Sequence, residues 1–170
     1  VYDWPGGKRL AVYVALNLET FAFGEGMGAK LTPSHGEPDV LNYTWRDYGN
    51  RVGAWRLRDL FDELALPSSV LVNTWVYDEA PGLIDAFRAR GDEIVAHGRT
   101  NSERQGAMSE AEEAAMIAEV TGRISAEEGK QPMGWLGPWI SQSPATPDLL
   151  AEAGYTDRKP LSLKVMISSS

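Results

Sequence analysis

The alternation of short apolar runs with helical patterns is the feature that most limits how this chain can fold. Apolar runs typical of buried strands occur at Leu10–Leu16, Ser69–Asn73, Glu93–Ala96 and Pro132–Leu136. Helical signals follow the runs, at residues 52–64, 81–90, 109–129 and 146–154. This alternation predicts an α/β fold with a parallel sheet and right-handed crossovers. The first run is continuously apolar, so we expect that strand to be buried on both faces.

Local signals set some of the boundaries between these elements. Ser109 and Glu112 form a capping box at the start of the third helix. Residues 20–50 are rich in Gly and Pro and are predicted to be a long irregular region, of the kind that forms lids or binding loops. After about residue 155 the alternation stops, although residues 161–167 have the composition of a fifth strand.

Composition excludes several classes of partner. The net charge of −8 argues against binding to nucleic acid, whose phosphate backbone attracts basic proteins. No apolar run approaches the roughly 20 residues of a membrane span, so no membrane partner is expected and a cytoplasmic location is the default. The chain has no cysteine, which excludes disulfides and thiolate metal sites.

Polar and aromatic side chains follow each of the four apolar runs. Because the carboxyl ends of parallel strands meet at one edge of a sheet, we expect these side chains to converge on one candidate site. The residues concerned are Asn17, Glu19, Asn73, His97, Arg99, Asn101, Trp135 and Trp139.

Glu19 and His97 are the pair in which chemistry is most expected. A carboxylate beside an imidazole can divide general-base and general-acid roles, or can share a metal ion. The alternative is a salt-bridged pair that only fixes two strand ends. A third metal ligand would have to be Asn101, a neutral amide and a weak ligand for zinc. The sequence therefore predicts either no metal or a weakly bound divalent metal, zinc or similar, at Glu19, His97 and Asn101.

Each remaining candidate has a functional and a structural interpretation. Arg99 could bind a carboxylate or polarise a carbonyl, or could pair with an acidic residue as a structural arginine. Arg46 lies in what resembles a binding loop, or it anchors that loop on the body of the protein. Trp135 and Trp139 could form a stacking platform for a sugar or a heterocycle, or could simply be packed. Asn17, Asn73 and Asn101 are further candidates for substrate binding.

Four motifs together resemble the polysaccharide deacetylase family, which is carbohydrate esterase family 4-like. They are Asn17–Glu19, Tyr43–Gly53, His97–Ser102 and Gly134–Pro138, and the match is best to the allantoinase-like branch. The resemblance covers roughly residues 4–155. It implies a distorted (β/α) barrel of the glycoside hydrolase/deacetylase type. It also implies hydrolysis of non-peptide carbon–nitrogen bonds, in N-acetylated sugars or in the cyclic amide of allantoin.

The sequence departs from the family pattern at its metal ligands. Standard members bind a divalent metal through one Asp and two His residues, with a further Asp as base. Here Asn17 and Glu19 occupy the region of the two aspartates, His97 matches the first metal histidine, and Asn101 stands in place of the second. The resemblance thus implies little or no metal, and we expect catalytic roles for Glu19 as base and for His97 or Arg99 at the scissile carbonyl.

The family also continues beyond the point where this chain departs from it. We therefore expect a single domain over residues 1–170, truncated after about 155, with about four or five βα units, or roughly half of a barrel. The expected partner is a small-molecule or oligosaccharide substrate. The alternatives are a non-catalytic carbohydrate- or ureide-binding module and an inactive fragment. A fragment would expose apolar sheet edges and form homo-oligomers.

Overall fold

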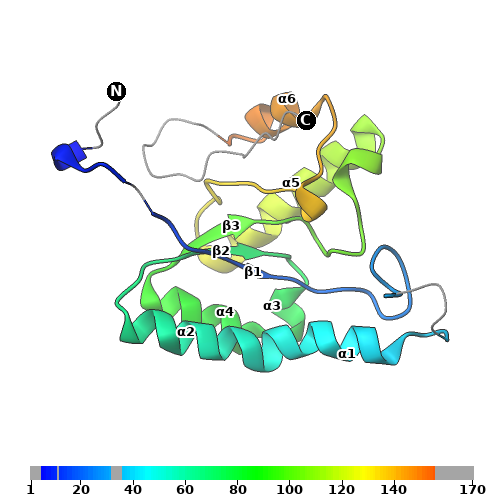
Figure 1. The fold of residues 1–170 in the computed structure, drawn as a ribbon. Coiled ribbons are helices and arrows are strands. Elements are labelled where there is room, and N and C mark those ends of the chain that lie inside the picture. The colour runs from blue at the N-terminus through cyan, green and yellow to red at the C-terminus, as the bar shows by residue number, and fades with distance from the viewer. Residues whose placement is uncertain (1–4, 11, 32–35, 156–170) are drawn as a thin grey trace.

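The computed structural model describes residues 5–10, 12–31 and 36–155. At its centre is a parallel sheet of three strands, β1 (Ala15–Leu18), β2 (Ser69–Val72) and β3 (Glu93–Ala96), in the spatial order β1-β2-β3. Helices α1 to α4 lie on one side of this sheet, and α5 and α6 lie on the other (Figure 1). The mixed α/β fold and the parallel sheet are as the sequence predicts. The expected fifth strand at residues 161–167 lies outside the described residues.

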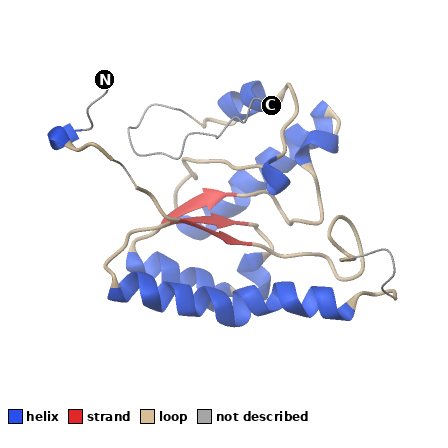
Figure 2. Cartoon of the chain, in the orientation of Figure 1, coloured by secondary structure: helices blue, strands red, loops and turns tan. Residues whose placement is uncertain are grey.

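Strand register brings three chain segments to the same level of the sheet. Leu18 is opposite Val72, and Val72 is opposite Ala96, so all three strands end in one row. The loops that carry the polar motifs leave the sheet from this end (Figure 2). The next residue of each chain segment, Glu19, Asn73 or His97, therefore stands at one edge of the sheet, as the parallel topology requires.

The four predicted helices follow the strands in the expected order, and two further helices, α1 and α3, are present. Their bounds are α1 (Val40–Tyr48), α2 (Ala54–Glu63), α3 (Val76–Glu79), α4 (Pro81–Arg90), α5 (Glu110–Glu128) and α6 (Thr146–Glu152), with a π-helical turn at Gly49–Gly53 between α1 and α2. The predicted capping box is present, because Ser109 accepts a bond from the Glu112 N–H while the Glu112 carboxylate accepts from the Ser109 N–H. No helix within the described residues has the length and apolar character needed to cross a membrane.

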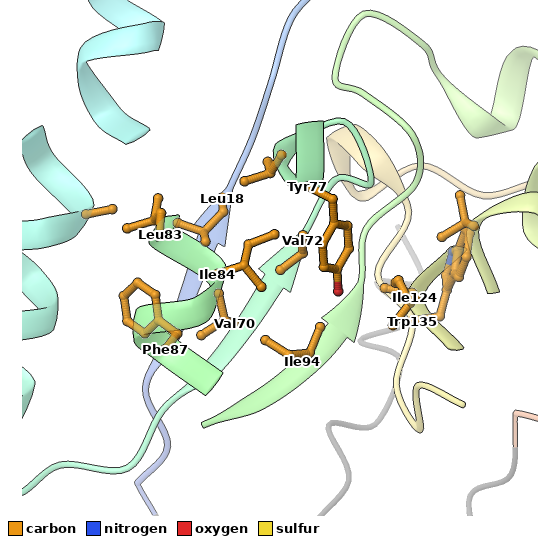
Figure 3. Packing of buried hydrophobic residues seen from close by; sticks show 14 of the residues in the cluster. Leu18, Val70, Val72, Tyr77, Leu83, Ile84, Phe87, Ile94, Ile124 and Trp135 are labelled. Carbon is orange, nitrogen blue, oxygen red and sulfur yellow. The ribbon is translucent and has the colours of Figure 1, made fainter. Parts of the chain in front are cut away.

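The hydrophobic core is concentrated around the central strand. Figure 3 shows Ile84 of α4 directed at Val70 and Val72 of β2, and Leu83 and Phe87 of the same helix belong to the same core cluster. All five side chains are at most 1% exposed, and α5 covers the opposite side through residues such as Ile124 (Figure 3). β2 and β3 are therefore held rigidly, and the positions of their carboxyl ends are determined by core packing.

Three predictions about elements were wrong. Leu10, Val12 and Tyr13 are 62–78% exposed, because β1 is an edge strand that begins only at Ala15. The predicted fourth strand is a single parallel bridge between Ala96 and Trp135, since Pro132 to Leu136 makes no further ladder bonds. The region 20–50 contains α1, which begins at an Asp39 cap and continues through the π-helical turn into α2. Mixed aromatic and β-branched residues concealed that helix from periodicity.

Candidate functional site

Asn73 joins the ends of all three strands. Its side-chain oxygen accepts a hydrogen bond from the Thr20 N–H at 3.0 Å, and its amide nitrogen donates to the His97 carbonyl. The same nitrogen lies 3.4 Å from the Asn101 side-chain oxygen. Asn73 is fully buried. It therefore cannot reach a substrate, and its predicted substrate-binding role is corrected to that of a residue that positions the site.

Glu19 and His97 come together in the structure. Glu19 Oε1 lies 3.2 Å from His97 Nε2, and His97 Nδ1 lies 2.6 Å from the carbonyl oxygen of Leu136. A carbonyl only accepts hydrogen bonds, so Nδ1 carries a hydrogen and donates it to Leu136. The other ring nitrogen, Nε2, faces the Glu19 carboxylate within hydrogen-bond distance.

The two partners differ in their access to solvent. The His97 side chain is 2% exposed, whereas that of Glu19 is 30% exposed. Burial raises the pKa of the Glu19 carboxyl, but hydrogen bonds from His97, Asn17 and Asn101 together with the charge of His97 outweigh it, and the net pKa is lowered. Glu19 is thus ionised at neutral pH and is the member of the pair that can contact water or substrate. His97 acts through Glu19, as a positioning residue.

Arg46 lies beside Glu19 and stacks on an aromatic ring. Its guanidinium carbon is 3.9 Å from the centroid of the Phe21 ring, and its Nε donates to Asn42 at 3.1 Å. Burial lowers the pKa of Arg46, and the negative charge of Glu19 partly offsets this effect. Two hollows share the lining residues Glu19, Phe21, Arg46 and Asn50. Arg46 is therefore placed to meet a group that approaches Glu19, while it also anchors the loop on Phe21.

Trp139 borders the site from the loop after the Trp135 bridge. Its indole N–H donates to the Asn101 carbonyl at 2.8 Å. Its ring packs edge-to-face with that of Phe21, and the two ring centroids are 6.4 Å apart. It is 42% exposed, so one part of the ring is open to solvent. The backbone is in the left-handed region at Trp139 and at Ile140, with φ of 61° and 52°, which is unusual for residues other than Gly. Strain of this kind is often retained at binding sites.

Two further predictions are corrected by the structure. Arg99 pairs with Glu103 at 2.7 Å and with Glu119 of α5 at 2.9 Å, and these bonds raise its pKa. These contacts agree with the structural one of the two alternatives for Arg99. Trp135 is 1% exposed, and its N–H donates to Gln105 at 3.1 Å. A ring so enclosed offers no face for a sugar, so of the two tryptophans only Trp139 is left as a candidate for stacking.

The side chains do not form a metal site as they stand. Among residues 5–10, 12–31 and 36–155, no three His, Cys, Asp or Glu side chains are grouped so that they could hold a metal ion. Asn101 does not complete the set, because its side-chain oxygen faces Asn73 and its amide nitrogen is the group that bonds to Glu19. An NH₂ group is not a metal ligand. Glu19 and His97 would be the two groups available to a weakly bound cation.

Some residues around the site were missed by the sequence interpretation. They are Thr20, Phe21, Tyr43, Asp47, Asn50 and Glu79, which line the hollow next to Arg46. Asn50 also supports Glu19 directly, since its amide donates to the Glu19 carbonyl at 2.8 Å. Tyr43, Asp47 and Asn50 belong to the tryptophan-containing motif that the sequence did show. Nothing in the pattern distinguished Phe21 or Glu79.

Comparison with known proteins places this geometry in a structural context. No protein-family model matches the chain, and no curated protein matches it. Solved structures do match. A protein named a probable polysaccharide deacetylase from Pseudomonas aeruginosa PAO1 has a TM-score of 0.74 at 30% identity, over 89% of this chain and 54% of that one. The Puue allantoinase has a TM-score of 0.74 at 28% identity, over 89% and 53%. A Mycobacterium smegmatis protein named for the deacetylase family has a TM-score of 0.73 at 26% identity, over 91% and 52%.

These matches define the class of the protein, which has an α/β fold of the deacetylase type. More particularly, the chain resembles the polysaccharide deacetylases and the allantoinase, and the resemblance indicated by its four motifs is confirmed. The chain spans about half the length of these structures. The three described strands form an open sheet within that fold.

Proposed function

We propose that this chain carries the centre of a hydrolase of non-peptide carbon–nitrogen bonds, deacetylase-like or allantoinase-like. The observation that supports this most is the partly exposed Glu19 carboxylate, which contacts the buried His97 and is flanked by Arg46. The likeness to structures named as a deacetylase and an allantoinase agrees with the same chemistry. The expected substrates are small ureides and N-acetylated sugars or oligosaccharides, in carbohydrate or ureide metabolism.

In the proposed reaction, water attacks an amide carbonyl carbon. Glu19 takes a proton from the water, the water oxygen bonds to the carbon, and the carbon–nitrogen bond breaks. Glu19 then passes the proton that it took from the water to the leaving nitrogen, so that an acid and an amine are released. Arg46, in place of Arg99, supports the negative charge that develops on the carbonyl oxygen. Asn17, which bonds to Glu19 at 3.0 Å, orients the carboxylate.

The test is the turnover of N-acetylglucosamine oligomers and small ureides by the wild type and by Glu19→Gln. The substitution keeps the shape of the side chain but removes its basicity, and we expect at least a hundredfold loss in kcat, by analogy with the roughly 10²–10⁴-fold value of general-base catalysis. Glu25→Gln is the matched control, since Glu25 is an exposed carboxylate on the same loop. Equal rates for wild type and Glu19→Gln would remove Glu19 from the mechanism.

A second function, a non-catalytic carbohydrate- or ureide-binding module, is favoured by one observation. Asn101 directs its NH₂ group at Glu19, at the position where a catalytic site would need a further metal ligand or a second base. Isothermal titration with the same sugars and ureides separates the two proposals. Heat of binding without any turnover would favour the module.

An inactive fragment is the remaining alternative. Within the described residues, β1 pairs only with β2, and nearby Leu10, Val12 and Tyr13 are exposed. An open apolar edge of this kind promotes self-association. Homo-oligomers or aggregates in size-exclusion chromatography would support the fragment, and a monomer that binds or turns over substrate would exclude it.

A further inference from the structure

A second carboxylate, Glu113, is completely buried outside the strand-end site. It lies in the first turn of α5 and is 0% exposed. Its oxygens accept hydrogen bonds from the Gln105 amide at 2.6 Å, from the Ser143 hydroxyl at 2.5 Å and from the Thr146 hydroxyl. A buried carboxylate is costly unless donors surround it, so the arrangement calls for an explanation beyond helix capping.

The three donors come from two segments that are far apart in the chain. Gln105 precedes α5, whereas Ser143 and Thr146 follow the Trp139 loop and begin α6. The oxygen of the Gln105 amide accepts from the Trp135 indole at 3.1 Å. Glu113 is therefore the point at which both ends of residues 135–146 are attached to the rigid helix α5.

The loop between those two ends is tightly closed. A Cβ atom added at Gly137 would lie 2.2 Å from the Ser141 carbonyl oxygen and 2.5 Å from the Gln105 side-chain oxygen. The Ser141 hydroxyl donates to the Pro138 carbonyl at 2.8 Å. Trp139 and Ile140 between them have positive φ. A strained backbone of this kind persists only where surrounding contacts over-determine it.

The closed loop presents Trp139 to the candidate site. The Trp139 N–H is bonded to the Asn101 carbonyl, and its ring touches Phe21, on which Arg46 stacks. Any change that opens the loop would withdraw the indole from Asn101. The same change would leave the Glu19–His97 contact in place, since His97 is held by Leu136 and Asn73 on the other side of Gly137.

We infer that Glu113 is a positioning residue whose buried carboxylate holds the strained Trp139 loop against the candidate site. Its consequence for substrate affinity rests on the proposed function, with Trp139 as the aromatic wall. The position of Trp139 itself does not depend on any activity. We therefore expect Glu113 variants to raise KM more than they lower kcat.

The test follows Trp139 by ¹⁹F NMR in protein labelled with 5-fluorotryptophan. The chain has six tryptophans, and Trp139→Phe identifies the Trp139 resonance by its disappearance. In Glu113→Gln, the Trp139 resonance is expected to move to the position of a solvent-exposed indole. The resonance of Trp75, which immediately precedes α3 and is assigned in the same way with Trp75→Phe, should stay unchanged. Glu110→Gln is the control, because Glu110 is exposed in the same helical turn. An unmoved Trp139 resonance in folded Glu113→Gln would overturn the inference.

A milder variant covers the case in which Glu113→Gln does not fold. Ser143→Ala removes one donor to Glu113 and is expected to broaden or shift the Trp139 resonance in the same direction. If it leaves Trp139 unmoved while the protein is folded, the inference fails. Absence of turnover in the wild type would count against the proposed function without affecting the ¹⁹F result. In an active wild type, Glu113→Gln is expected to raise KM at least threefold with kcat changed less than twofold, and a fall in kcat alone would contradict the positioning role.

Discussion

Glu19 and Glu113 are two carboxylates of the same chain in opposite surroundings. Glu113 is enclosed, and its oxygens accept from three neutral donors that also tie distant segments together. The Glu19 side chain is 30% exposed and faces an imidazole whose other nitrogen is already committed to a carbonyl. The oxygens of Glu113 are all engaged by neighbouring donors, whereas the ionised Glu19 carboxylate keeps access to solvent. The difference separates a group that maintains the structure from one that is available for chemistry.

The largest expected effect is on stability, from Glu113→Ala. The substitution leaves a cavity and three buried donors without their acceptor, and we expect a loss of about 3–5 kcal/mol in the free energy of unfolding. Urea denaturation measures it. Glu110→Ala, in the same helical turn but exposed, should change stability by no more than about 0.5 kcal/mol. A similar small change in Glu113→Ala would mean that the buried network is not formed.

Asn73→Ala tests the link between the strand ends and Glu19. It removes a fully buried amide that bonds to Thr20, His97 and Asn101, and we expect a loss of about 2 kcal/mol in unfolding free energy. The Glu19–His97 contact should loosen as well, because both residues are next to groups that Asn73 holds. If the protein is active, kcat should fall even though Asn73 touches no substrate. A destabilised variant with unchanged kcat would show that Asn73 supports the fold only.

The pH dependence of the free energy of unfolding tests the surroundings of Glu19, the second carboxylate of the comparison. Its pKa in the folded protein is lowered from an ordinary value of 4.5. The folded state therefore favours the ionised carboxylate, and this stabilisation is complete above the unfolded pKa. It is lost as the pH falls below 4.5 and through the folded pKa. Glu19→Gln should therefore flatten the stability curve below about pH 4.5 relative to the wild type. Parallel curves for the two proteins would contradict the lowered pKa.

The smallest effect is expected from Arg99→Gln. Arg99 pairs with Glu103 and Glu119 in a partly exposed position, and such pairs contribute at most about 1 kcal/mol. We expect a change of that size or less in unfolding free energy, and unaltered turnover or ligand affinity. A large loss of activity without loss of stability would show that Arg99 takes part in the candidate site.

Much of the site could be predicted because parallel topology brings strand ends together. Glu19 and His97 were correctly expected to meet, since each follows a strand in the same sheet. Trp135 and Arg99 were harder, because Trp135 is buried against Gln105 and Arg99 pairs with Glu103 and Glu119. Side-chain direction after the last strand residue depends on loop dihedral angles, and the motif carries no signal for these. Phe21 and Glu79 were missed for the same reason.

The sequence by itself determined the class of the fold, through the alternation of apolar runs and helical patterns, and it determined which polar groups could gather at one sheet edge. These properties depend on local periodicity and on the order of elements along the chain, and both can be read directly from the sequence. Only the tertiary structure decided that the carboxylate of Glu113 is buried and that of Glu19 is partly exposed. In the folded chain, the buried Asn73 side chain bonds to the ends of the strands, and the Asn101 amide faces Glu19. Glu113 is bonded to Ser143, which follows the Trp139 loop. Burial and hydrogen-bond partners arise from residues tens of positions apart, so they appear only when the chain is folded.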